Sequence, residues 1–364
     1  MSQPADTVLL GLLSAKLKPT GKRPVHAIQA YIAQNDRVAR LAVGFADGDT
    51  VRAHPDDQFK VASITKTMTA VVILQLAEEG ALELEAPVAF YLKAVPFVRI
   101  QDIHRYNDTL YGDQVTVLQL LNHRSGIADL FDDAAVRFYL SVYLHKQRSW
   151  SPEKLFARFY KYNLPKKAHF KPGEGYRYSD TNYFLLGLLA ETVTGKQLPE
   201  LFRERIYTPL QLNATYFEYY EPAQPNGHTT HQFLWRVNAT HKLNTSYDWA
   251  GGGVVSTCND LARFLEGLFA NQLFRKPETL ARMLADTPHS FPNGKTSNYG
   301  LGITRYTYNE TVFYGHSGFW GSQVMYSPEK KLVFCANINQ ANPVKTFNSR
   351  QLISDLLRAF EAEQ

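Results

Sequence analysis

The sequence predicts an α/β fold of the α+β type, in which one antiparallel sheet is assembled from both ends of the chain. Two observations predict it. Apolar, β-rich segments lie near the start of the chain and again near its end, whereas helical patterns and irregular stretches fill the middle. Since strands at both ends need pairing partners, we expect a single sheet flanked by helices, with a mainly helical region inserted.

The expected division of the chain follows from that pattern. Residues 1–80 and 290–364 would form the sheet region, including a helix that carries a candidate nucleophile. Residues 81–289 would form the mainly helical region with irregular insertions. A chain of 364 residues that is 45% hydrophobic is long enough for a substantial core, and we expect the two regions to make one unit.

The first elements are a helix over residues 6–17 and a hairpin of residues 25–32 and 38–46. The turn-prone Gln34-Asn35-Asp36 separates the two strands. Residues 63–79 change to helical spacing, and Gly80 provides a stop. Because several faces of this helix are apolar, we expect it to be buried.

The middle of the chain predicts further helices, at residues 117–122, 152–162, 182–194, 198–206 and 259–269. Residues 215–250 are rich in aromatic residues, Pro and Asn and have no regular period. We interpret them as an insertion that borders a site. Together with residues 130–150, they would set specificity.

The end of the chain returns to strands and then closes with an amphipathic helix at residues 349–362. The expected strands are residues 300–308, 311–314, 322–327 and 332–336. The last two are joined by the turn Pro328-Glu329-Lys330. These strands would complete the sheet begun by the first hairpin.

Charge and hydropathy exclude several classes of partner. The 39 Lys and Arg residues are scattered among 34 Asp and Glu residues, which gives no support for nucleic-acid binding. One short basic patch (Lys166, Lys167, His169 and Lys171) is interpreted as a solvated loop. The longest apolar stretch, residues 70–77, is too short to span a bilayer.

No leader segment is visible at the N-terminus, so we expect a cytoplasmic protein as the sequence stands, or a periplasmic or secreted one if a leader was removed. Cys258 and Cys335 lie among apolar residues and are expected to be two buried thiols. His228 and His231 have no further ligand at suitable spacing, so neither a metal nor another cofactor is expected.

The first chemical signal is Ser63-Ile64-Thr65-Lys66 at the start of the buried helix. This spacing places the Lys66 amine one turn beyond the Ser63 hydroxyl and on the same face. A partly desolvated lysine can act as the base that a serine nucleophile needs, and the helix start offers N–H groups to a developing oxyanion. Alone, the pattern is more often an N-cap serine with a surface lysine, so further motifs are needed.

Two more motifs accompany it: Tyr178-Ser179-Asp180 before a helix, and His316-Ser317-Gly318 after a strand. With these three motifs, the sequence resembles the family of serine β-lactamases and low-molecular-weight penicillin-binding proteins, especially its class C β-lactamase, D,D-carboxypeptidase and carboxylesterase branch. The resemblance extends from about residue 25 to the end. It includes residues 120–126, 252–257, 260–262 and 299–302.

The resemblance implies a fold and a set of roles. The fold would be that of the β-lactamases and transpeptidases. Ser63 would be the nucleophile, Lys66 its activating partner, and Tyr178 a proton carrier whose phenolate is favoured by Lys66 and His316.

The oxyanion hole would be the N–H groups of Ser63 and Phe319, at a strand edge that aligns the substrate. The expected substrate-binding residues are Asp180, His316, Ser317, Gly318 and Phe319. His123 and Ser125 are interpreted as structural residues behind the site.

The chain departs from the family pattern at two positions. Asp180 replaces the usual asparagine; its carboxylate can only accept hydrogen bonds, and it would pair with Lys66 and raise the pKa of that lysine. His316 replaces the usual lysine and leaves less fixed positive charge. Both changes favour a small-acyl esterase or a D-amino-acyl peptidase or amidase over an enzyme that hydrolyses antibiotics.

Two alternatives remain open at this point. One is a weak β-lactamase or D,D-carboxypeptidase, and the other is a non-catalytic penicillin-binding or sensor homologue. The expected partner is a small-molecule ester, peptide or β-lactam. The sequence leaves the oligomeric state open.

Overall fold

The computed structural model describes residues 4–224, 228–240, 242–285, 289–291, 296–342 and 349–362. Its centre is a six-stranded antiparallel sheet in the order β12-β13-β14-β15-β1-β2. The strands are β1 (Ala27–Gln34), β2 (Arg37–Gly44), β12 (Thr304–Tyr308), β13 (Thr311–Ser317), β14 (Ser322–Ser327) and β15 (Leu332–Ile338).

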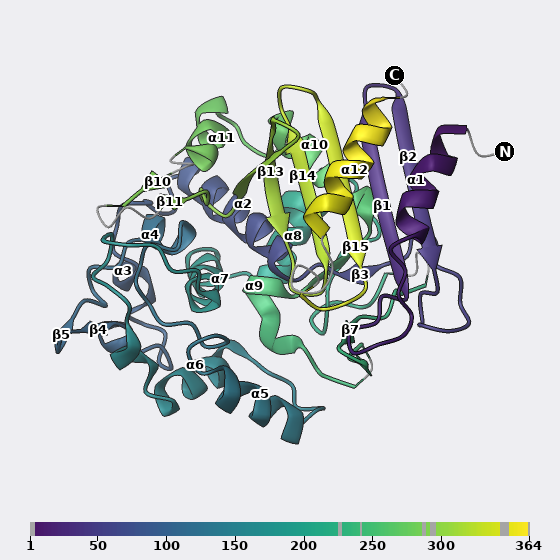
Figure 1. Ribbon diagram of the computed structural model, residues 1–364. Helices are drawn as coiled ribbons and strands as arrows, with labels where there is room; N and C mark the ends of the chain where they lie inside the picture. Colours follow the sequence, from purple (N-terminus) through teal and green to yellow (C-terminus); the bar gives the residue numbers. More distant parts are fainter. Residues whose placement is uncertain are drawn as a thin grey trace.

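The two ends of the chain meet where β1 pairs with β15. Ile28 lies opposite Ile338, and Gln34 lies opposite Leu332. Every residue of β15 is buried, as is every residue of β1 except Gln34, because helices cover both faces of the sheet here. The expected antiparallel sheet built from both chain ends is confirmed (Figure 1).

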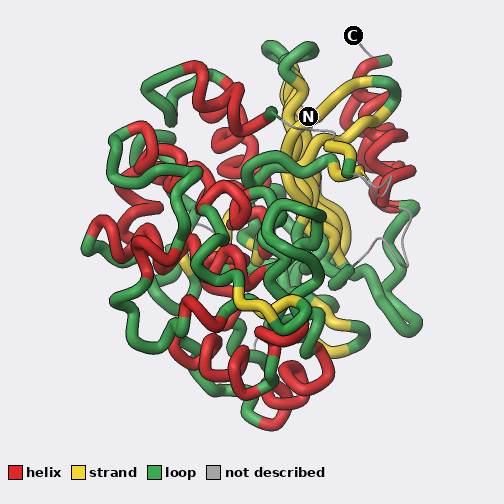
Figure 2. The backbone as a smooth tube through the Cα atoms, turned by 90° about the vertical axis from the view of Figure 1, so that its left-hand side faces the viewer, coloured by secondary structure: helices red, strands yellow, loops and turns green. Residues whose placement is uncertain are grey.

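Helices lie on both sides of this sheet, as the rotated view shows (Figure 2). The terminal helices α1 (Pro4–Ser14) and α12 (Ser349–Glu361) pack together on one face and enclose an apolar cluster with β1, β14 and β15. On the opposite face, α10 (Cys258–Phe269) packs against β14 and β15. The apolar stripes of α10 and α12 account for this arrangement.

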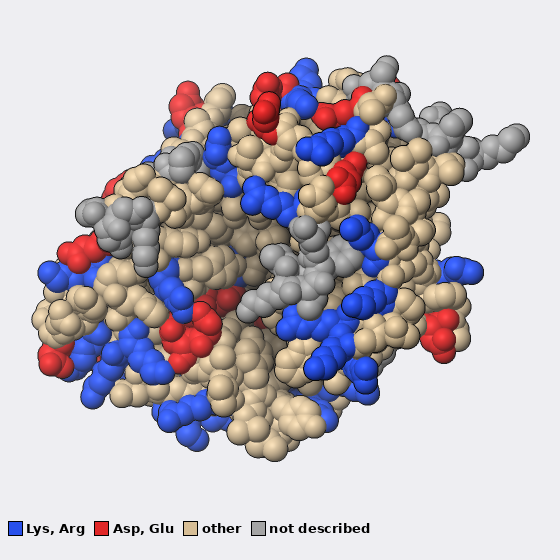
Figure 3. Space-filling view, viewed as in Figure 1, with Lys and Arg blue, Asp and Glu red and all other residues tan. Residues whose placement is uncertain are grey.

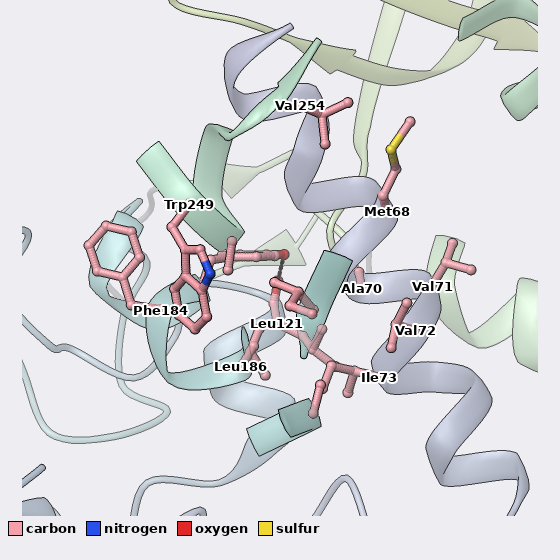
Figure 4. Close-up of a cluster of buried hydrophobic side chains, with 14 of the residues drawn as sticks. Met68, Ala70, Val71, Val72, Ile73, Leu121, Phe184, Leu186, Trp249 and Val254 are labelled. Atoms are coloured by element: carbon pink, nitrogen blue, oxygen red, sulfur yellow. Dashed lines mark hydrogen bonds between the residues drawn. The ribbon is translucent and has the colours of Figure 1, made fainter. Parts of the chain in front are cut away.

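Helix α2 (Thr65–Glu78) lies at the centre of the second and larger apolar cluster. It packs against α7 (Asp180–Thr194) and α9 (Trp249–Gly252). Figure 4 shows Met68 of α2 near Val254 and, further along the same helix, Ile73 near Leu186 of α7. The expected burial of this helix is confirmed.

A small three-stranded sheet brings the start of α2 beside distant segments. Its strands are β6 (Tyr216–Phe217), β9 (Val254–Ser256) and β3 (Phe59–Lys60), with β9 in the middle. Strand β3 leads directly to Ser63, and β9 follows the run of three glycines at 251–253. This sheet, which the sequence did not predict, therefore fixes the turn that carries the candidate nucleophile Ser63 against the glycine run.

Most of the expected helices of the middle region are present. They are α4 (Val117–Leu121), α6 (Pro152–Lys161), α7 and α8 (Leu198–Phe202), which continues as a wider turn over Arg203–Tyr207. The short helix α3 (Ala89–Leu92) was not predicted. Three pairs of two-residue strands were also not predicted: β4–β5 (Arg105–Tyr106, Thr109–Leu110), β7–β8 (Phe233–Leu234, Val237–Asn238) and β10–β11 (His289–Ser290, Thr296–Ser297).

Two longer helices were also unpredicted: α5 (Ala135–Leu144) and α11 (Pro277–Leu284). Apolar residues occur on more than one side of α5, which hid its helical period. Strand β12 begins at Thr304, later than the expected residue 300, because Gly302 adopts a left-handed turn. Strand β13 runs on to Ser317, three residues past its expected end.

Cys258 and Cys335 are free and buried, as expected. The basic patch is more ordered than the expected solvated loop. Lys166 and Lys167 end a 3₁₀ turn, Lys167 donates to the Asp133 carbonyl, and His169 contacts the Asp133 carboxylate.

Among the helices described, none is both long and apolar enough to cross a membrane.

Candidate active site

Ser63 lies on a 3₁₀ turn (Ala62–Ile64) between β3 and α2. The preceding residue, Ala62, has a left-handed backbone with φ of +48°. This conformation is costly for a residue with a side chain, and such strain persists only where the surroundings impose it. Here β3 on one side and the buried α2 on the other hold the turn, which leaves Ser63 partly exposed at a cavity.

The Lys66 side chain is fully buried and points to three oxygen atoms. Its Nζ lies 3.1 Å from Ser63 Oγ, 2.5 Å from Asp180 Oδ1 and 2.7 Å from the Gly251 carbonyl. The carboxylate and the carbonyl can only accept. A neutral amine would therefore give its two hydrogens to them and turn its lone pair toward the Ser63 hydroxyl.

Tyr178 lies beside the serine, and the Ser63 side chain partly offsets the rise in the pKa of the phenol. Its ring lies against His123, with 4.3 Å between centroids, and Lys66 Nζ is 5.0 Å from its centre. Burial, followed by the charge of Asp180, raises the pKa of Tyr178 well above its ordinary value. This direction is opposite to the expected one, because burial disfavours the phenolate and the Asp180 carboxylate disfavours it further. The resting phenol is neutral.

Asp180 is the first residue of α7, and its backbone N–H donates to Asp129 Oδ2 at 2.5 Å. The expected pairing of its carboxylate with Lys66 is present. Asp129 is buried, and burial together with the nearby Asp180 charge raises its pKa to about 7. The site therefore holds a buried ion pair with a second carboxyl group behind it.

His316 lies near the end of β13 and is buried. Its Nδ1–H donates to the Ser317 carbonyl at 2.8 Å, so its Nε2 accepts from the Tyr299 hydroxyl at 3.0 Å. Burial and the Lys66 charge lower the pKa of His316 to about 3. The expected contribution of positive charge from His316 is therefore wrong: the imidazole is neutral, with both nitrogens hydrogen-bonded inside the protein.

The turn after β13 is held directly against the nucleophile turn. A Cβ atom at Gly318 would lie 2.1 Å from the Val61 carbonyl, so this position cannot carry a side chain. The Ser322 hydroxyl donates to the same carbonyl at 2.8 Å. These contacts bring Ser317, Gly318 and Phe319 to the cavity that Ser63 lines.

His123 and Ser125 lie behind the site, as their structural interpretation requires. His123 Nδ1 accepts from the Ser179 backbone N–H at 3.1 Å, and the Ser125 hydroxyl donates to the Asn182 side-chain oxygen at 2.7 Å. Both contacts fix the backbone between Tyr178 and the start of α7.

All eight expected site residues except Lys66 line one cavity of about 830 Å³; Lys66 lies beneath it. Four aspartates line the cavity too: Asp129, Asp132, Asp180 and Asp248. Its aromatic lining includes Phe131, Tyr139, Tyr247 and Phe319. Figure 3 shows a hollow near the middle of this face with acidic side chains on its wall.

Sequence reasoning missed Asp129, Asp248 and Gly251. Burial, and then the charge of Asp180, raises the pKa of Asp248 to about 8. Gly251 supplies the carbonyl that Lys66 binds, and a Cβ there would lie 2.7 Å from Asp180 Oδ1. The run of three glycines could have indicated that Gly251 lies close to another backbone. Asp129 and Asp248 are single aspartates in irregular segments, and no sequence pattern marked them.

No group of three or more His, Cys, Asp or Glu residues within the described ranges is arranged to hold a metal ion. The chemistry available to the described residues is that of a serine hydroxyl, an amine, a phenol and carboxylates.

Comparison with known proteins identifies the family. A family model described as Beta-lactamase matches residues 15–357. The chain belongs to the beta-lactamase family. The resemblance drawn from the three motifs is confirmed by this match.

Among the relatives in the beta-lactamase family is the D-aminopeptidase of Brucella ovis, which is 26% identical over 321 residues and covers 82% of the chain. The match covers 55% of that relative. The chain spans 34% to 58% of the length of the first curated relatives it matches.

Solved structures confirm the fold. A D-stereospecific amidohydrolase from Streptomyces is 26% identical with a TM-score of 0.76, covering 94% of this chain and 98% of its own. The D-amino acid amidase from Ochrobactrum anthropi SV3 is 22% identical with a TM-score of 0.80, covering 99% of both chains. The expected β-lactamase-like architecture is therefore correct.

Proposed function

We propose that the protein is a serine hydrolase that forms an acyl-enzyme on Ser63 and cleaves amides or esters of D-configured amino acids with a free amino group. The contact that carries the hydrolase proposal is the one between Ser63 Oγ and Lys66 Nζ at 3.1 Å, with Tyr178 lining the same cavity beside the serine. This is the arrangement of a nucleophile and its base.

The proton transfers follow from the hydrogen bonds. When Lys66 is neutral, its lone pair accepts the Ser63 proton while Ser63 Oγ bonds to the substrate carbonyl carbon. The N–H groups of Ser63 and Phe319 stabilise the oxyanion. The Tyr178 phenol then donates its proton to the leaving amine or alkoxide, and the adjacent Lys66 ammonium stabilises the phenolate. Water hydrolyses the acyl-enzyme by the reverse sequence.

The preference for a free amino group rests on the acidic wall. Asp129, Asp180 and Asp248 line the same cavity as Ser63, beside the aromatic rings of Tyr139 and Tyr247. A bound ammonium group would itself favour the ionised forms of Asp129 and Asp248, whose pKa values are raised in the free protein. Ionised carboxylates and aromatic faces both attract an ammonium group. Two similar proteins named for D-specific substrates, the Brucella ovis peptidase and the Streptomyces amidohydrolase, support the D configuration.

The same wall disfavours the β-lactamase and D,D-carboxypeptidase alternatives, whose substrates carry a carboxylate. Lys66 and Arg177 are close enough to the cavity to attract an anion, but Lys66 is bound to Asp180, and Arg177 is bound to Asp132 and Asp133. An esterase would use the same nucleophile without the ammonium contact. A non-catalytic sensor would not require the arrangement of Ser63, Lys66 and Tyr178.

The first test concerns the nucleophile. Intact-protein mass is measured after incubation with a fluorophosphonate and, separately, with benzylpenicillin, for the natural protein and for Ser63→Ala. We expect a fluorophosphonate adduct that Ser63→Ala lacks, and a loss of turnover of roughly a thousandfold or more in that variant. An adduct that persists in Ser63→Ala would refute the assignment of Ser63. Rapid benzylpenicillin acylation would favour the penicillin-recognising alternative.

The second test concerns the ammonium. D-aminoacyl anilides with a free or an acetylated amino group are compared by their KM values. Asp248→Asn should raise KM for the free amine by about tenfold and leave the acetylated substrate unchanged. The control is Asp113→Asn, because Asp113 is exposed and does not line the cavity. Equal effects of Asp248→Asn on both substrates would rule out an ammonium contact.

A further inference from the structure

Helix α5 (Ala135–Leu144) is apolar on two sides. Phe138 and Val142 are buried and face the core. On the solvent side, five apolar side chains are between 41% and 83% exposed: Val136, Tyr139, Leu140, Tyr143 and Leu144. Their spacing of three and four residues places them in one stripe. Tyr139 also contacts the rings of Phe131, Phe138 and Tyr247, whereas the side chains of Leu140 and Leu144 are more than half exposed.

The surroundings of the stripe are positively charged. Residues 134–152 contain Arg137, Lys146 and Arg148 but no aspartate or glutamate. Lys146 Nζ lies 4.4 Å from the centre of the Tyr143 ring, at the C-terminal end of the stripe. At the other end, Lys166 and Lys167 line the same surface hollow as Val136 and Arg137. Asp132 and Asp133 line it too, but both pair with Arg177. Figure 3 shows uncharged surface at the lower end of the molecule, where α5 lies, between groups of Lys and Arg.

We propose that the exposed stripe of α5 and its flanking cations bind an anionic lipid surface. Exposed leucine and tyrosine side chains between lysine and arginine residues are the composition of helices that lie in the membrane interface. The apolar side chains would enter the acyl boundary, while the cations pair with lipid phosphates. Tyr139 belongs both to the stripe and to the lining of the catalytic cavity, so the cavity would open beside the lipid surface.

A second copy of the chain is a less suitable occupant. Five side chains are far fewer than the roughly 20–30 residues per side of a stable protein interface. A two-fold contact through this stripe would also bring Arg137, Lys146 and Arg148 of both copies together, and like charges oppose such a contact. An anionic surface satisfies both the apolar and the charged parts of the stripe.

The test is co-sedimentation of the whole chain with phosphatidylcholine vesicles, with and without roughly 30% phosphatidylglycerol. We expect binding only to the anionic vesicles, weakening with added salt. The double variants Leu140→Ser with Leu144→Ser, and Lys146→Gln with Arg148→Gln, should each weaken binding by about tenfold or more. Turnover of a soluble substrate should stay unchanged, which shows that the variants are folded.

The matched control is Phe90→Ser. Phe90 of α3 is 68% exposed and also has a lysine, Lys93, over its ring, but it lies outside the stripe. This variant should bind vesicles like the natural protein. The proposal is overturned if the natural protein ignores anionic vesicles or if the leucine variants bind them unchanged. It is equally overturned if sedimentation finds a dimer that the leucine variants abolish, because the occupant is then a second copy.

Discussion

The ion pair between Lys66 and Asp180 determines the electrostatics of the site at the scale of single residues. Lys66 is fully buried, and its charge is balanced by Asp180 at 2.5 Å. Burial, and then the same carboxylate, raises the pKa values of its neighbours Tyr178, Asp129 and Asp248. One aspartate in place of the family's usual asparagine therefore affects each proton carrier near Ser63.

We predict that Asp180→Asn shifts the alkaline limb of the kcat/KM profile toward lower pH by about one unit or more. After burial, the Asp180 charge is the next cause of the raised pKa of Tyr178, so without it the phenol that protonates the leaving group loses its own proton at lower pH. The asparagine oxygen still accepts a hydrogen bond from Lys66. The measurement is the pH dependence of kcat/KM with a substrate that does not titrate in that range.

The control for Asp180→Asn is Asp113→Asn, which removes an exposed carboxylate away from the cavity and should leave the profile unchanged. A shift toward higher pH in Asp180→Asn would contradict Tyr178 as the acid that protonates the leaving group.

At the scale of elements, the site depends on the close approach of α7 and α9. A Cβ at Gly187 of α7 would lie 2.6 Å from Ala250 Cβ and 2.8 Å from the Trp249 ring. Helix α9 carries Gly251, whose carbonyl binds Lys66. Gly187 thus allows the contact between α7 and α9 that places the Gly251 carbonyl, one of the three partners of Lys66.

Gly187→Ala should therefore destabilise the protein by about 1–3 kcal/mol, because well-packed cores resist added atoms. It should also lower kcat at temperatures where the variant is still folded, since α9 must move away from α7. Urea unfolding and steady-state kinetics provide the two measurements.

Gly11→Ala is the matched control, because Gly11 also lies in a helix but has open space around it. It should stabilise the protein by up to about 1 kcal/mol and leave kcat unchanged. If Gly187→Ala behaves like Gly11→Ala, the close approach of α7 and α9 does not matter for the site.

At the scale of the whole molecule, the buried carboxyl groups make stability depend on pH. The pKa of Asp129 is raised to about 7 and that of Asp248 to about 8, by burial first and by Asp180 second. Unfolded aspartates ionise near pH 4, so between about pH 4 and pH 8 the folded state binds more protons than the unfolded state. The stability that these two groups contribute falls as the pH rises through this window and levels off above it.

Each such group contributes at most about 1.4 kcal/mol per pH unit within the window. His316, with its lowered pKa, stabilises the fold as the pH rises, opposite to the two aspartates. We therefore predict a difference between two proteins: from pH 5 to pH 8, the Tm of Asp248→Asn falls less, or rises more, than that of the natural protein. Calorimetry at both pH values makes the comparison. An equal change of Tm in the two proteins would show that Asp248 is already ionised at pH 5 in the folded protein.

Local patterns in the sequence determined much of this protein. The sheet built from both chain ends was predictable because strands show a local alternation of apolar and polar residues. The buried helix after Ser63 was predictable from its helical spacing, which also places Lys66 one turn beyond Ser63. The pairing of Lys66 with Asp180 was inferred from the types of residue alone, and the geometry agrees.

Only the tertiary structure decided the electrical environment of the site. The neutral state of His316, the raised pKa of Tyr178 and the carboxyl groups of Asp129 and Asp248 beside Ser63 depend on burial and on contacts between segments far apart in the chain. A pKa is determined by desolvation and by charges a few ångströms away, and neither can be read from the order of residues. The motifs named the reacting groups, and the packing of the chain determined their charges.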